Sequence, residues 1–204
     1  MGAAVGKEVA VASLVGRDIG AAIDEVAALR IAVFRDWPYL YDGDRDYEAR
    51  YLAGYASNPR AIAVTVRAPD GAVVGAATGM PLVDHDAALA RAVADAGIDP
   101  EGTFYCAESV LLPAWRGRGL GHRFFDEREA HARRLGLARS CFCAVVRPDD
   151  HPARPEGARS LVPFWEGRGY RPLPGAVARL SWKDLGDGAE TEKTLAFRIR
   201  ELDP

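Results

Sequence analysis

The stretch that decides the fold is residues 105–122, which read YCAESVLLPAWRGRGLGH from Tyr105 to His122. The apolar run through Leu111 and Leu112 is typical of a buried strand. Pro113 lacks the N–H that a longer strand would need and favours an extended Leu112, so we expect the strand to end near Leu112. Glycine then stands at every second position from residue 117 to 121, and residues at helical spacing follow: Leu120, Phe124, His131 and Leu135.

A glycine-rich turn between a strand and a helix is a potential binding site for a phosphate group. Its backbone N–H groups are unpaired and lie at the positive end of the helix dipole, and the missing side chains let an anion approach closely. The spacing does not fit other nucleotide-binding motifs, because no Gly-Lys-Ser or Gly-Lys-Thr follows and the glycines are not spaced as G-x-G-x-x-G. A tight connection without a ligand is the alternative interpretation.

The pattern Arg116-x-x-Gly119-x-Gly121, directly behind a strand that ends in Leu-Leu-Pro, resembles the acyl-CoA signature of the GNAT superfamily of N-acetyltransferases. The resemblance implies a GNAT-like α/β fold with a mixed, mostly antiparallel central sheet flanked by helices. It also implies acetyl-CoA as the acyl donor, with its pyrophosphate on the loop backbone and its pantetheine arm along the strand end. The residues expected to bind CoA are Ser109, Val110, Leu111, Leu112, Arg116, Gly117, Arg118, Gly119, Leu120, Gly121 and His122.

Several basic side chains lie near this loop. Arg118, Arg123 and Arg128 are candidates for a CoA phosphate, because a guanidinium matches phosphate oxygens bidentately. A solvated basic helix face is the alternative for each of them. The resemblance gives His122 a role through its main-chain N–H rather than its ring, whereas His85 and His151 stand in polar segments and are expected to be exposed.

Composition narrows the classes of protein. The 204 residues carry a net charge of −3 with a pI near 5.8, which gives no electrostatic reason to expect nucleic acid or an anionic membrane as partner. We expect one α/β domain over residues 1–204 with an extra helical insertion around 85–98. No apolar run approaches the ~18 residues of a membrane span, and Met1–Glu8 do not resemble a signal peptide. A cytoplasmic monomer or homodimer is the expectation.

The three cysteines, Cys106, Cys141 and Cys143, all lie in apolar, strand-like runs. A free cysteine in such a run behaves as a small buried hydrophobe. Their odd number, with no C-x-x-C pair and no nearby histidine cluster, predicts neither a disulfide framework nor a metal site.

Periodicity and turn residues place the other elements. Asp18 is expected to cap the first helix, and the strand after the central helix should run parallel to the central strand. Ser160 is expected to cap a short helix near the end of the chain. Strands are predicted at 9–15, 62–67, 73–80, 140–146, 177–182 and 194–199, and helices at about 18–33, 47–56 and 86–96.

Acetyl transfer to an amine needs a group that takes up a proton. Glu108 is the first candidate for this base, because it is the only carboxylate within the central strand. An ion pair with a nearby arginine is the alternative role. Tyr105 is the second candidate, but residues three apart in a regular strand point to opposite faces, so both can line one site only if a bulge intervenes.

The C-terminal part departs from the GNAT pattern. Where many members have a tyrosine as general acid, this chain has Trp165, and an asparagine often found seven residues earlier is Ala158. The acid therefore stays unassigned among Tyr170, Cys143 and water. This departure motivates an alternative function, a catalytically idle acyl-CoA-binding regulatory domain.

The segment between the first two helices carries the candidates for binding the amine. Aromatic rings beside carboxylates suit an ammonium group through cation–π attraction and charge pairing, and this connection borders the acceptor pocket in the GNAT family. A hydrophobic anchor with solvated acids is the alternative. The candidates are Arg35, Trp37, Tyr39 and Tyr41, with Asp42 and Asp44 as accompanying carboxylates.

Overall fold

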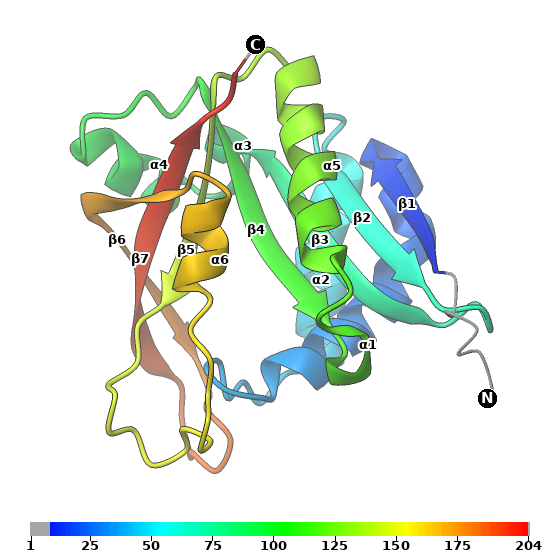
Figure 1. Ribbon diagram of the computed structural model, residues 1–204, viewed down its shortest axis with the longest axis vertical. Coiled ribbons are helices and arrows are strands. Elements are labelled where there is room, and N and C mark those ends of the chain that lie inside the picture. Colours follow the sequence, from blue (N-terminus) through cyan, green and yellow to red (C-terminus); the bar gives the residue numbers. More distant parts are fainter. Residues whose placement is uncertain (1–8, 204) are drawn as a thin grey trace, which may run out of the picture.

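A computed structural model describes residues 9–203, so the expectation about Met1–Glu8 concerns residues outside it. The described chain forms a seven-stranded sheet with helices on both faces (Figure 1). Five of the six strand pairs are antiparallel, which confirms the predicted mixed, mostly antiparallel sheet. In spatial order the strands are β1 (Ala10–Val15), β2 (Ile62–Arg67), β3 (Val73–Pro81), β4 (Thr103–Leu111), β5 (Arg139–Val145), β7 (Thr191–Glu201) and β6 (Arg171–Trp182).

The sheet splays open at its centre. Strand β4 runs parallel to β5, as predicted, but pairs with it only over Thr103–Tyr105 against Arg139–Cys141. Beyond these residues the two strands diverge (Figure 1), while β5 stays paired with β7 along its whole length. The second half of β4 is therefore left with a free edge towards β5.

The helices divide between the two faces of the sheet. Helix α5 (Leu120–Arg134) and the short α6 (Val162–Gly167) lie on one face, and α1 (Ile23–Phe34) and α2 (Arg45–Ser57) lie on the other (Figure 1). After β3 the chain forms α3 (Leu82–His85) and α4 (Ala87–Asp95), and α4 packs against β6. Over residues 9–203, no helix is long and apolar enough to cross a membrane.

The first helix differs from its prediction. Residues Gly16–Ala22 form a 3₁₀ helix, and the α-helix begins only at Ile23. The chain turns already at Gly16, whose φ of +56° is in the left-handed region and whose N–H donates to Ala61 O at 3.1 Å. Asp18 therefore lies inside the first turn, where its side chain caps nothing.

Two hydrophobic layers hold the sheet between these helices. Phe124 and Phe125 of α5 pack with Phe104, Phe142 and the strands β2 and β3 on one face. On the other face, Val26 and Leu29 of α1 pack against β3 and β4. All three cysteines are buried free thiols, as predicted. The residues of the candidate site project from this fixed framework.

Candidate active site

A β-bulge in β4 brings the two candidate bases to one side of the sheet. The register with β3 shifts so that Thr78 stands opposite two residues, Ala107 and Glu108. In a regular strand, the side chains of Tyr105 and Glu108 would point to opposite faces. With the bulge, both line the same pocket.

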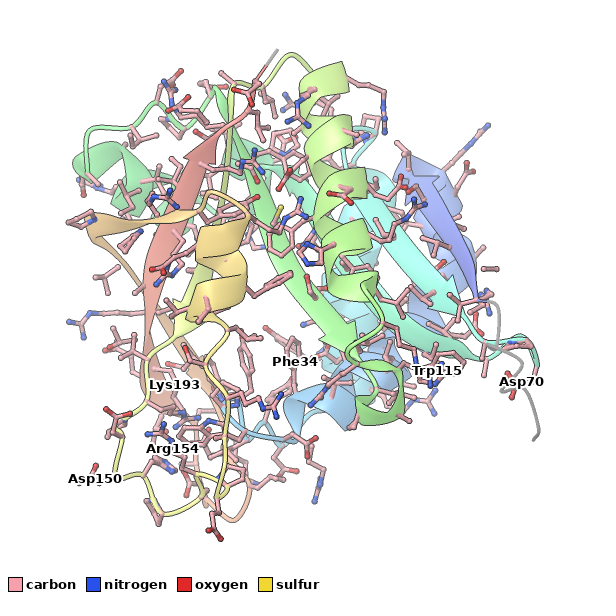
Figure 2. All side chains as sticks on the ribbon, in the orientation of Figure 1. Phe34, Asp70, Trp115, Asp150, Arg154 and Lys193 are labelled. Atoms are coloured by element: carbon pink, nitrogen blue, oxygen red, sulfur yellow. The ribbon has the colours of Figure 1, made fainter. Side chains whose placement is uncertain are left out.

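This pocket has a volume of about 730 Å³ and lies on the face of the sheet that α1 and α2 cover. Its lining comes from β4, from both helices, from α3 and from the strands β5, β6 and β7. Phe34, at the end of α1, is one of the lining residues and is seen in the opening between the diverging strands (Figure 2). The pocket thus lies directly beside the free edge of β4.

A buried arginine links two carboxylates at the base of the pocket. Arg30 Nη1 lies 2.5 Å from Glu108 Oε1, and Arg30 Nε donates to Glu48. Glu48 is 0% exposed and Glu108 is 8% exposed. Burial opposes the charge of Arg30, but the neighbouring groups, led by Glu108, outweigh it and hold the pKa of Arg30 well above its usual range. One guanidinium thus stands between two buried carboxyl groups in the interior.

Glu108 also belongs to a chain of hydrogen-bonding groups. Tyr51 donates from its hydroxyl to Glu108 Oε2 at 3.2 Å, and the same hydroxyl lies 2.8 Å from Tyr55 Oη and 3.3 Å from His85 Nε2. Burial raises the pKa of Tyr51 and lowers the pKa of His85. Both are therefore neutral near pH 7, and His85 lines the pocket rather than being exposed as the sequence suggested.

Tyr105 and Cys143 form a second pair in the pocket. Their Oη and Sγ atoms lie 3.1 Å apart. Burial raises the pKa of Tyr105 well above its usual range and raises the pKa of Cys143 to about 11. Tyr105 therefore keeps its proton near neutral pH, which makes it a hydrogen-bond donor and a poor base, and the Cys143 thiol is a weak nucleophile.

The glycine loop presents free N–H groups at the start of α5. In the described chain, the N–H groups of residues 117–121 donate to no backbone carbonyl. Gly117 and Gly119 have φ near +75°, and a Cβ on either would meet no protein atom within 4 Å. His122 differs from the expectation, because its N–H already donates to Gly119 O at 3.0 Å. The loop has the donors and the space that a phosphate group requires.

The three arginines near this loop have different surroundings. The Arg118 guanidinium is exposed and stacks 4.8 Å from the Trp115 ring, close to the loop. Arg123 pairs with Glu127 on the exposed face of α5. Arg128 is only 1% exposed and points into the protein, so of the three candidates it is neither a phosphate ligand nor part of a solvated helix face.

Arg128 instead holds the bulge from the opposite face of the sheet. Its Nη1 donates to Glu108 O at 2.8 Å and to Thr78 O at 3.1 Å, and its Nη2 donates to Ser109 Oγ at 2.8 Å. A bulge interrupts the ladder and leaves backbone groups to be satisfied by other donors. Arg128 is thus a positioning residue for the backbone that carries Glu108.

Replacing Arg128 with methionine should destabilise the fold strongly. Each buried carbonyl left without a donor costs roughly 1–3 kcal/mol, and Arg128 serves two at the bulge. Urea unfolding would measure the loss, with Arg123→Met on the exposed face of the same helix as control, where we expect a change within about 0.5 kcal/mol. Equal changes in the two variants would contradict this role of Arg128.

Arg147 and a β-bridge connect the segment between α1 and α2 to the β6–β7 hairpin. Arg147 donates to Pro38 O and Tyr39 O, at 2.9 and 2.8 Å, and pairs with Asp184 at 2.7 Å. Tyr41 forms a β-bridge with Asp184. Two of the predicted acceptor residues, Tyr39 and Tyr41, line the pocket as a result, with Asp42 and Asp44.

Other candidates lie outside the pocket. Arg35 and Trp37 are not among its lining residues, and Trp37 instead packs against His151 with the two rings tilted and their centroids 5.2 Å apart. Trp165 packs on Phe142, and Tyr170 is fully buried, with its hydroxyl donating to Glu129 and lying 2.8 Å from Ser140 Oγ. Neither Trp165 nor Tyr170 lies where it could protonate a group in the pocket.

Sequence reasoning missed the residues around Glu108. Arg30 stands among apolar residues in the helix predicted at about 18–33, and an arginine on such a face signals a buried carboxylate partner. Glu48, Tyr51 and Tyr55 follow one another at intervals of three and four, which places them on one face of α2. That spacing was the available signal for a polar helix face turned towards the sheet.

Comparison with known proteins identifies the family and the fold of the chain. The family model described as acetyltransferase (GNAT) family matches residues 27–156. Among curated proteins, none matches the sequence. The 130 residues that the family model matches include the bulge, the glycine loop, α5 and the segment between α1 and α2.

Solved structures share the fold at low sequence identity. A GCN5-related N-acetyltransferase from Kribbella flavida is 19% identical, with a TM-score of 0.55 over 95% of this chain and 98% of that one. YncA from Salmonella typhimurium, solved with its cofactor acetyl-CoA, is 15% identical, with a TM-score of 0.57 over 97% and 95%. A phosphinothricin acetyltransferase from Sinorhizobium meliloti, in complex with acetyl-CoA, is 15% identical, with a TM-score of 0.55 over 95% and 88%.

Proposed function

Because the chain belongs to the GNAT family of acetyltransferases, we propose that it transfers an acetyl group from acetyl-CoA to the amine of a small molecule or a peptide. The amine attacks directly in a ternary complex. The observation that carries the proposal is the position of Glu108, which lines a large pocket on the strand that leads into the glycine loop.

The glycine loop and the free edge of β4 are the proposed sites for acetyl-CoA. Two of the solved relatives named above hold acetyl-CoA. In this chain the free N–H groups of residues 117–121 suit its pyrophosphate, and Arg118, within the loop, has an exposed side chain. The edge of β4 near Ser109 is open to main-chain pairing with the pantetheine arm, whereas Leu111 O already accepts from Arg116 Nε at 3.1 Å. Bound acetyl-CoA supplies the thioester whose C–S bond breaks.

Glu108 is the proposed base. As the amine nitrogen bonds to the acetyl carbon and the CoA thiolate departs, one amine proton passes to the Glu108 carboxylate. Arg30 and Tyr51 fix that carboxylate by an ion pair and a hydrogen bond. Tyr105 keeps its proton, which favours Glu108 over Tyr105 in this role. The raised pKa of the Cys143 thiol supports direct transfer rather than an acetylated cysteine.

The rival function is an acyl-CoA-binding domain without turnover. It is motivated by Trp165 and Ala158, which replace the tyrosine and the asparagine expected from the family pattern. The two functions differ in one respect, because only an enzyme releases the CoA thiol in an amine-dependent manner.

Incubation with acetyl-CoA and a broad panel of amines, followed by detection of free thiol, separates the two functions. We expect thiol release that requires both the protein and an amine, with rates that saturate in each substrate. Calorimetry with CoA accompanies the assay. Tight binding of CoA together with no turnover on any amine would favour the binding domain.

A further inference from the structure

We propose that the acceptor is a di- or polyamine that carries no acidic group. This inference rests on the proposed acetyl transfer and narrows it to a class of substrate. It follows from the charges that line the pocket, where seven carboxylates stand against two cationic side chains. The carboxylates are Asp42, Asp44, Glu48, Asp84, Asp86, Glu108 and Glu190.

Both cations of the lining are already neutralised. Arg30 pairs with Glu48 and Glu108, and Lys183 Nζ lies 3.0 Å from Asp42 Oδ2. Among the described lining residues, none is a cationic side chain without a carboxylate partner. An acceptor with a carboxylate or phosphate would therefore enter a negative pocket and find no counter-charge there.

Three of the carboxylates have no cationic partner in the described chain: Asp44, Asp86 and Glu190. Asp44 and Asp86 cap α2 and α4, and each cap uses only the Oδ1 atom. Glu190 is exposed and lies on the β6–β7 hairpin. These residues come from three different elements, so they offer negative charge away from Glu108.

Two acceptor atoms in the interior of the pocket are free to accept a hydrogen bond. Glu48 Oε1 and His85 Nδ1 are buried and have no hydrogen-bond partner. Glu48 is 0% exposed, and the lowered pKa of His85 keeps its ring neutral. An ammonium group carries three donors and no acceptor, so it complements these atoms where a carboxylate, which only accepts, would not.

Aromatic rings complete a surface suited to a chain with charged ends. Phe34, Tyr39, Tyr41, Tyr47 and Trp182 line the walls. Such rings attract cations over their faces and offer apolar surface to methylene groups. One amino group of the acceptor would lose its proton and attack beside Glu108. The second amino group would keep its positive charge among Asp44, Asp86 and Glu190.

Two sets of matched acceptors test the proposal: butylamine, 1,4-diaminobutane and 4-aminobutanoate, and the corresponding eight-carbon compounds. Within a set the number of carbon atoms is constant and only the far end changes, from methyl to charged aminomethyl to carboxylate. In at least one set we expect kcat/KM for the diamine to exceed that of the monoamine about tenfold, and the amino acid to fall below the monoamine by a similar factor. Salt should reduce these differences, because it screens exposed charges.

A triple variant tests whether these three carboxylates cause the preference for a diamine over a monoamine. Asp44→Asn, Asp86→Asn and Glu190→Gln together remove three negative charges, while asparagine still caps a helix. We expect the ratio of diamine to monoamine to fall towards one. The control, Asp70→Asn with Asp150→Asn and Glu156→Gln, makes the same change at exposed residues outside the pocket, and Asp70 and Asp150 lie at the periphery (Figure 2). The control should keep the wild-type ratio.

Three results would overturn the proposal: equal rates within both sets, a preference for the amino acids, or a ratio that survives in the triple variant. If other amines in the broad panel are acetylated while these diamines are not, the substrate class is wrong and the acetyl transfer stands. If no amine is acetylated at all, the transferase function itself fails.

Discussion

Replacing Glu108 with glutamine should lower amine-dependent turnover about 10²–10⁴-fold, the usual contribution of a positioned proton acceptor. The amide has nearly the same shape and can still accept the hydrogen bond from Tyr51, but it cannot take up the proton of the attacking amine. Affinity for CoA should change little, because Glu108 lies outside the glycine loop. Steady-state kinetics beside calorimetry with CoA would measure both effects.

The pH profile distinguishes the base from a purely structural carboxylate. If Glu108 is the base, the loss in Glu108→Gln should shrink as pH rises, because the amine then loses its proton in solution. If Glu108 serves only to pair with Arg30, the variant should lower the melting temperature and keep the pH profile of wild type. Turnover unchanged near neutral pH would exclude the catalytic role.

Replacing Gly119 with valine should weaken CoA binding about 10²-fold or more. The Cβ of such a residue points into space that no protein atom occupies, where the proposed phosphate would lie. Displacing the phosphate loses charge-assisted hydrogen bonds of about 1.5–3 kcal/mol each, and two of them suffice for this factor. Calorimetric titration with CoA measures the change.

Gly71→Val is the matched control for Gly119→Val. Gly71 has a φ of +87° against +77° for Gly119, and its Cβ would also meet no protein atom within 4 Å. The two variants therefore share the backbone strain, but Gly71 lies in the turn between β2 and β3. We expect similar losses of stability and a loss of CoA affinity only at Gly119. Wild-type affinity in Gly119→Val would remove the support for the phosphate loop.

The strand, glycine turn and helix of residues 105–122 could be predicted because their signals are local. Pro113 ends the strand, and glycines at 117 and 119 permit the left-handed turns that precede α5. Local patterns also predicted the hairpin of β2 and β3 and the parallel pairing of β5 with β4. In each of these elements, short-range sequence preferences agree with the tertiary structure.

The neighbourhood of Glu108 could not be predicted in the same way. The bulge depends on Arg128, which reaches two carbonyls from a helix on the far face of the sheet. The ion pair with Arg30 joins residues that are 78 positions apart in the sequence. The periodicity of a single element carries no information about such contacts. Only the three-dimensional structure shows that Glu108 pairs with Arg30 and that it shares a pocket with Tyr105.

The fate of the acetyl group in a single turnover tests the account most directly. Protein loaded with acetyl-CoA would be mixed with an amine, quenched at successive times and examined by mass spectrometry for acetyl-CoA, acetylated amine and acetylated protein. We expect the acetyl group to pass from CoA to the amine in equal amounts, with unmodified protein throughout. An acetyl group that stays on CoA with every amine, or that appears on the protein before it reaches the amine, would contradict direct transfer at this site.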